Sequence, residues 1–169
     1  MMRLIATALS AASVALALSA WPALAASPED FLKAYAMQAA AADPGFDGFS
    51  AQRGQAFYYK KHPVEDLGMA SCATCHHADP LKATAAHRDQ IPCRACHITF
   101  SRQPDSHTPG KSEIPPLAPA GNPSRFTSEW MVEHWFAYNC KLLLLRECTP
   151  VEKGDLITWL LTVQPAPSR

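Results

Sequence analysis

The chain has 169 residues, which is enough for one domain. Its fifteen basic and fifteen acidic residues balance and form no basic stripe, so composition argues against nucleic acid or an anionic membrane surface as a partner. The fifteen prolines are many for this length and predict long irregular connections. Such a chain fills a core more easily around a large apolar cofactor.

The first 25 residues have the pattern of a secretory signal peptide. Arg3 gives a positive start, residues 4–20 are largely apolar, and Ala23-Leu24-Ala25 fits the cleavage rule. A transmembrane anchor is the alternative, but the run is short and ends at Trp21-Pro22. We therefore expect a soluble, periplasmic mature domain at residues 26–169 with a net charge near −1.

Two helices are predicted in the first part of the mature chain. Ser27 is a suitable N-cap with Pro28 in the first turn, which predicts a helix over residues 28–42. A second, shorter helix is expected over residues 51–60, where His62-Pro63 ends it.

The C-terminal part predicts a further pair of helices. Thr127 or Ser128 caps a helix over residues 128–139, and the capping box that starts at Thr149 and ends at Glu152 opens a helix over residues 150–163. No strand pattern with a period of two appears, so the expected fold class is all-α.

Two stretches share the pattern Cys-x-x-Cys-His, at residues 72–76 and 93–97. Two cysteines about one helical turn apart can bond to the two vinyl groups on one edge of a porphyrin, and the adjacent histidine can ligate the iron. The pattern therefore predicts two covalently bound haem c groups. The attachment residues are Cys72, Cys75 and His76 for the first haem, and Cys93, Cys96 and His97 for the second.

Two other interpretations fit the cysteines alone. Seventeen residues separate Cys75 from Cys93, which also suits a four-cysteine zinc ribbon, and paired disulfides are a further alternative. Neither explains a histidine after both cysteine pairs, so haem is favoured. Cys140 and Cys148 remain as a separate pair in an oxidising compartment.

The sixth iron ligands are harder to predict from the residues. The histidines outside the two motifs are His62, His77, His87, His107 and His134. For the second haem we rank His87 first, then His107 and His77. Met69 and Met131 are thioether alternatives, although a core role is favoured for Met131.

One face of the helix before Cys140 is also a candidate. Met131, Trp135 and Asn139 recur every four residues and share that face. The face could cover a haem, with Trp135 packing on the ring and Asn139 above the iron. Spacing alone makes Asn139 an ordinary residue near the C-terminal end of a helix.

Several runs resemble one known family. They are residues 53–57, the first Cys-x-x-Cys-His stretch, the proline-rich segment 108–127, and the stretches 132–140 and 146–155. Together they resemble the sphaeroides haem protein (SHP) family of small periplasmic cytochromes c over nearly all of the mature chain. The resemblance implies a class I cytochrome c-like, loop-rich domain that wraps around haem.

The family's site residues carry over to matching positions here. The resemblance implies His76 as the proximal ligand, Asn139 as a weak sixth ligand that leaves on reduction, and a Cys140–Cys148 disulfide. The iron would then be open to oxygen or nitric oxide. It also implies redox partners, with a dihaem cytochrome or a membrane cytochrome b as electron donor.

The chain departs from the family in one respect. A segment at about residues 78–103, which contains the second motif, is inserted between the first motif and the proline-rich loop. The second haem could feed electrons to the first, or a histidine from the insertion could replace Asn139 and close the site.

Three functions follow as hypotheses. The chain is an electron carrier or relay, a protein that binds a diatomic ligand at the first haem, or a haem enzyme such as a peroxidase or a reductase of small oxides of nitrogen. No acid–base constellation stands out in the sequence, so an enzyme is the least favoured of the three.

Overall fold

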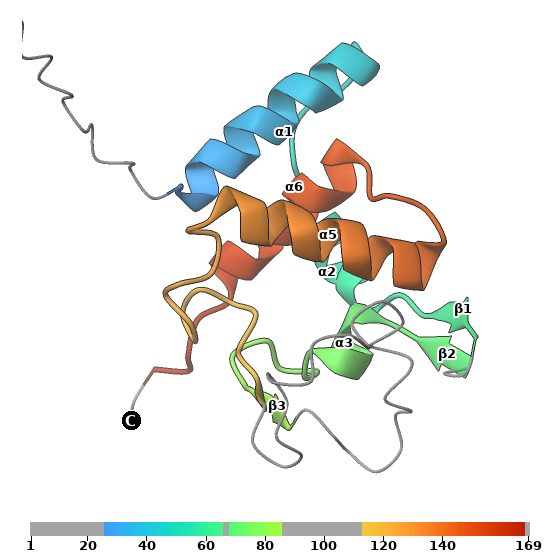
Figure 1. Ribbon diagram of the computed structural model, residues 1–169. Helices are drawn as coiled ribbons and strands as arrows, with labels where there is room; N and C mark the ends of the chain where they lie inside the picture. The colour runs from blue at the N-terminus through green and yellow to red at the C-terminus, as the bar shows by residue number, and fades with distance from the viewer. Residues whose placement is uncertain (1–25, 66–67, 86–112, 168–169) are drawn as a thin grey trace, which may run out of the picture.

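A computed structural model describes residues 26–65, 68–85 and 113–167, and this part of the chain is mostly helical. The helices are α1 (Pro28–Ala42), α2 (Ala51–Tyr59), the single-turn α3 (Cys72–Cys75), α5 (Glu129–Leu144) and α6 (Pro150–Thr162). In Figure 1, α1, α5 and α6 occupy the upper part of the view, with α3 and the strands below them. No helix in these ranges is long and apolar enough to cross a membrane.

The predicted caps start the long helices. The Ser27 hydroxyl accepts a hydrogen bond from the Asp30 backbone at 3.2 Å, and Thr149 accepts one from the Glu152 backbone at 3.2 Å. Both helices have proline in the first turn, as expected. Ser128 rather than Thr127 caps α5, through its bond with the Met131 backbone at 3.4 Å.

Helix α5 is longer at its C-terminal end than the sequence predicted. It continues through a lysine and three leucines, all good helix formers, to Leu144, and the C-cap residue Leu145 has a left-handed φ of 57°. Asn139 and Cys140 therefore lie inside the helix, about one turn before its end.

Among the described residues, four short strands form two antiparallel pairs. Strand β1 (His62–Val64) pairs with β2 (Gly68–Ala70), and β3 (Thr84–Ala85) pairs with β4 (Glu113–Ile114). Segments of two or three residues carry no readable period, which is why the sequence did not indicate them. In the second pair, Ala85 lies directly opposite Glu113.

The core forms where α6 packs against α2 and α1. A Cβ atom on Gly54 of α2 would lie 2.0 Å from the Asp155 carbonyl oxygen of α6, so only glycine allows this close approach. Nearby, the rings of Tyr58 and Trp159 lie 4.9 Å apart, and Arg53 forms an ion pair of 2.6 Å with the buried Asp155. This packing fixes α2 and α6, which support the site.

Candidate haem site

A cavity of about 420 Å³ lies between α3, the loop that precedes α5, α5 itself and α6. Its volume falls within the range of small-molecule and cofactor pockets. Its walls are mainly apolar, with leucines mostly from α5 and α6 and aromatic rings from α2, α5 and the loop between β4 and α5. The apolar lining residues include Phe57, Phe126, Trp135, Phe136, Leu142, Leu143, Leu144, Leu156 and Leu160.

Helix α3 brings the first motif to this cavity. Cys72, Cys75 and His76 all line it, and the His76 backbone N–H closes the helical turn on the Cys72 carbonyl at 2.8 Å. Neither cysteine forms a disulfide with another described residue. Burial raises the pKa of Cys72 to about 11, which keeps its sulfur neutral beside the apolar wall.

The environment of His76 keeps its imidazole in the neutral form. Burial first, and the positive charge of Arg125 second, lower the pKa of His76 to about 4. A neutral imidazole retains a lone pair for a metal. Among the described residues, the buried Nδ1 atom of His76 has no hydrogen-bond partner.

The predicted face of α5 also lines the cavity. Met131, Trp135 and Asn139 all contribute to its wall, so one helical face and the first motif border the same space. Trp135 and Met131 are still partly exposed, at 41% and 42%, which places them toward the mouth of the cavity. The chain itself thus supplies an amide, a thioether and an imidazole to one pocket.

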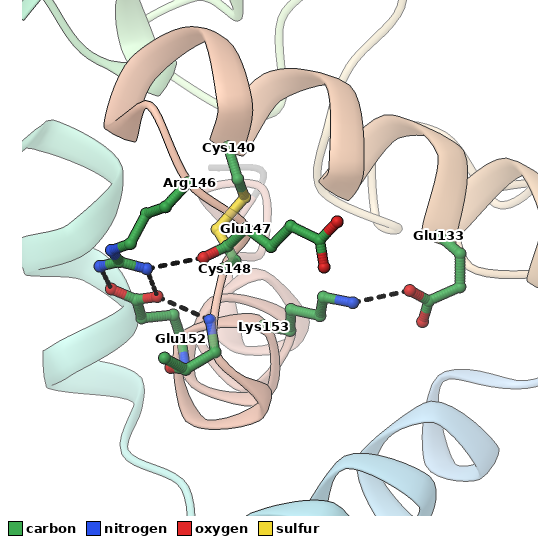
Figure 2. The surroundings of a disulfide bond; sticks show 8 residues. Glu133, Cys140, Arg146, Glu147, Cys148, Glu152 and Lys153 are labelled. Carbon is green, nitrogen blue, oxygen red and sulfur yellow. Dashed lines mark hydrogen bonds and ion pairs between the residues drawn. A yellow bond between two sulfur atoms is a disulfide. The ribbon is translucent and has the colours of Figure 1, made fainter.

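The Cys140–Cys148 disulfide that the resemblance implied is present, with its Cα atoms 5.5 Å apart. Figure 2 shows it between α5 and the start of α6, beside the paired Arg146 and Glu152 side chains, which bond at 2.7 Å and 2.8 Å. Cys140 is itself a cavity residue. The disulfide therefore ties the part of α5 that carries Asn139 to the N-terminus of α6.

Sequence reasoning missed Arg125, whose side chain lines the cavity from the loop before α5. Its Nε donates to the Pro116 carbonyl and its Nη2 to the Pro115 carbonyl, both at 2.8 Å. The next residue, Phe126, is buried in the wall with a left-handed φ of 59°, a strained conformation for an aromatic residue. The only available signal was an arginine within a proline-rich loop.

The other histidine and methionine candidates lie elsewhere. His77 is outside the cavity lining, and its Nδ1 accepts a hydrogen bond from the Asp79 backbone at 2.9 Å. Met69 is 57% exposed in β2, His62 lies in β1, and the ring of His134 stacks on Trp130. The signal segment 1–25, Cys93, Cys96, His97, His87 and His107 lie outside the described residues.

The donor set fits haem c. Two thiols and a neutral imidazole on one turn of helix face an apolar cavity, which is the arrangement that thioether attachment and axial ligation require. Of the inserted segment expected at about 78–103, residues 78–85 are described, and Pro80 accepts backbone bonds from Leu117 and Ala118 at 3.0 Å.

The family described as "Domain of unknown function (DUF1924)" matches residues 44–88 and 81–160. Among characterised proteins, the cytochrome c-type protein SHP of Cereibacter sphaeroides is 35% identical over 146 residues, covering 85% of this chain and 92% of that protein. Cytochrome c'' of Methylophilus methylotrophus is 31% identical over 134 residues, covering 79% of this chain and 78% of its own.

Solved structures of the same two proteins share the fold. Oxidised cytochrome c'' superposes with a TM-score of 0.62 at 30% identity, over 82% of this chain and 95% of that one. Oxidised SHP, described as an oxygen-binding cytochrome c, gives a TM-score of 0.58 at 30% identity, over 80% and 96%. The chain therefore belongs to the SHP and cytochrome c'' family of c-type cytochromes.

Proposed function

We propose that this c-type cytochrome attaches its first haem through Cys72 and Cys75 in the α3–α5 cavity, with His76 as the proximal iron ligand. The haem, when bound, supplies a one-electron iron couple and an axial position for a small ligand. The chain supplies the thiols, the neutral imidazole and the apolar walls that exclude water. The observation that carries the proposal is the convergence of the first motif and Asn139 on one cavity.

We further propose that Asn139 occupies the sixth position in the oxidised protein and gives way on reduction. An amide is a weak ligand for iron, so a diatomic molecule can take its place. Support comes from the place of Asn139 on the cavity wall, from the disulfide that ties the neighbouring Cys140 to α6, and from the description of SHP as oxygen-binding. The diatomic ligand is oxygen or nitric oxide.

The second Cys-x-x-Cys-His stretch leads us to propose a second haem and an electron-transfer role. The described residues stop at Ala85 and resume at Glu113, and these two residues are direct partners in the β3–β4 pair. Cys93 follows Ala85 by a short stretch, so a haem on Cys93 and Cys96, ligated by His97, would stay near the first haem.

The leader sequence supports export to the periplasm, where a dihaem cytochrome or a membrane cytochrome b would act as electron donor.

Carbon monoxide added to the reduced protein tests the ligand-binding proposal. We expect a Soret shift in about half of the haem absorbance, because only the first haem would open an axial position. If no shift occurs, electron transfer remains as the role, and the proposal that Asn139 gives way to a diatomic ligand on reduction is contradicted. A shift in all of the haem absorbance would contradict the assignment of gas binding to one haem.

A further inference from the structure

Arg125 is the only Arg, Lys, Asp or Glu among the described residues that line the cavity. Its side chain is half-buried, and burial lowers its pKa. The guanidinium nevertheless stays charged, because the ordinary pKa of arginine lies far above neutral pH. The apolar cavity therefore contains one lone positive charge at its wall.

The hydrogen-bond partners of the Arg125 guanidinium among the described residues are neutral carbonyls. Two of its N–H groups donate to the carbonyls of Pro115 and Pro116, and none of the ion pairs recorded for the described ranges involves Arg125. A guanidinium has five N–H donors in a planar fork, so donors remain after these two bonds. Partly buried charges are normally paired, which indicates that an anion completes this site.

The neighbouring polar residues do not supply that anion. The Ser124 hydroxyl donates to the Asn122 side chain at 2.8 Å, and the Thr127 hydroxyl donates to the Ser124 carbonyl at 2.8 Å. Ser128 caps α5. These groups are used by local turns and a helix cap, and all of them are neutral.

We propose that Arg125 binds a propionate group of the first haem, an inference that rests on the proposed function of the cavity. A haem has two propionates, and a carboxylate matches the guanidinium fork. The same side chain holds the Pro115–Pro116 backbone, so it joins the loop to the cofactor. Its positive charge lies on the wall of the cavity that would hold the haem and would favour the reduced state, so Arg125 would help to set the midpoint potential of the first haem.

The test compares Arg125→Gln with Arg125→Lys in the full mature chain. Arg125→Gln removes the charge, so we expect the equilibrium constant for reduction of one haem to fall on the order of tenfold in a potentiometric titration. Arg125→Lys keeps the charge and should change that constant much less. The propionate bending mode in resonance Raman should shift in both variants, because both lose the guanidinium fork.

A purely structural role for Arg125 gives a different pattern. Both variants lose backbone hydrogen bonds, so they should lose similar stability, but a structural residue would leave the potential and the Raman mode unchanged. Arg53→Gln is the matched control, because Arg53 is half exposed, pairs with Asp155 and does not line the cavity. It should lower stability without changing the potential of either haem.

The outcomes separate this inference from the proposed function. Haem content by the pyridine haemochrome assay should equal that of the wild type in all three variants. With haem present, unchanged potentials and an unchanged propionate mode in Arg125→Gln would overturn the inference. If Arg125→Gln does not fold, the Raman mode of Arg125→Lys decides alone. A wild-type protein without haem on Cys72 and Cys75 would instead overturn the proposed function.

Discussion

The phenol of Tyr58 donates a hydrogen bond to the backbone carbonyl of His76 at 2.6 Å, and the His77 carbonyl lies 2.7 Å from the same oxygen. Tyr58 is fully buried in α2, where its ring packs on Trp159. A residue eighteen positions upstream therefore holds the backbone at the end of the first motif. The helix pair α2 and α6 is in this way connected to the position of His76.

Removal of the Tyr58 hydroxyl should destabilise the protein. We expect Tyr58→Phe to lower the free energy of unfolding by about 1–2 kcal/mol, because it leaves the partly buried carbonyls of His76 and His77 without this donor. Denaturant unfolding measures the loss. Tyr59→Phe is the control, because its hydroxyl bonds to the Ala78 carbonyl at 2.7 Å from a partly exposed position, where water can replace it. An equal loss in both variants would contradict the role given to Tyr58.

Replacement of Asn139 tests the sixth ligand. We expect Asn139→Val to retain its haem and to make the oxidised first haem five-coordinate, because valine has no donor atom. Electronic absorption and electron paramagnetic resonance spectra of the oxidised protein report the change. Asn122→Ala removes the other asparagine amide from the cavity wall and should leave the spectrum unchanged. An unaltered oxidised spectrum in Asn139→Val would exclude Asn139 as the ligand.

The pairing of β3 with β4 allows the second motif to be removed cleanly. Ala85 and Glu113 are direct partners, so an Asn-Gly turn can join them in place of residues 86–112. We expect the shortened chain to fold with half the haem per chain of the full protein, because the first cavity is left intact. The pyridine haemochrome assay gives the ratio. A folded product with unchanged haem content would contradict the assignment of a haem to the second motif.

The disulfide should stabilise the end of α5. We expect the double change Cys140→Ser and Cys148→Ser to lower the free energy of unfolding by about 2–3 kcal/mol, from the entropy of closing a short loop. Lys141→Ala is the control in the same loop, because the Lys141–Glu147 pair of 3.4 Å is exposed and should contribute about 0.5 kcal/mol or less. Equal losses by denaturant unfolding would argue against the disulfide as the main constraint.

The histidine in β1 should make the protein less stable as the pH falls. Burial first, then the positive charges of Lys60 and Arg146, lower the pKa of His62, while Glu152 acts in the opposite direction. The folded pKa is thus below the unfolded value of about 6.5, so the unfolded chain binds more protons and stability is lost as the pH falls through that value. His62→Gln should reduce this loss, measured as unfolding free energies at about pH 7.5 and pH 5.5. Identical pH dependence in both proteins would contradict the prediction.

Local signals predicted the helices well. Ser27, Ser128 and Thr149 marked helix starts because capping depends on neighbouring residues alone. The C-terminal end of α5 was placed too early, because helix formers continue through Leu144. The strands were missed because each is shorter than the pattern that identifies a strand.

The site was predictable where its residues form a motif or a helical face. The Cys-x-x-Cys-His spacing singled out Cys72, Cys75 and His76, which line the cavity. The period of four placed Asn139 on one helical face, which also lines the cavity, but only the family resemblance indicated a ligand there. Arg125 could not be found in this way. The direction of the Arg125 side chain depends on the left-handed backbone at Phe126 and on hydrogen bonds to the carbonyls of Pro115 and Pro116. No local sequence pattern encodes these contacts.

Peptide mapping of the purified mature protein by mass spectrometry, with the haem left attached, tests the central claim most directly. We expect one haem on the peptide that contains Cys72 and Cys75, a second on the peptide that contains Cys93 and Cys96, and a disulfide between Cys140 and Cys148. A peptide with Cys72 and Cys75 free of haem, from cells that mature c-type cytochromes, would contradict the assignment of the cavity.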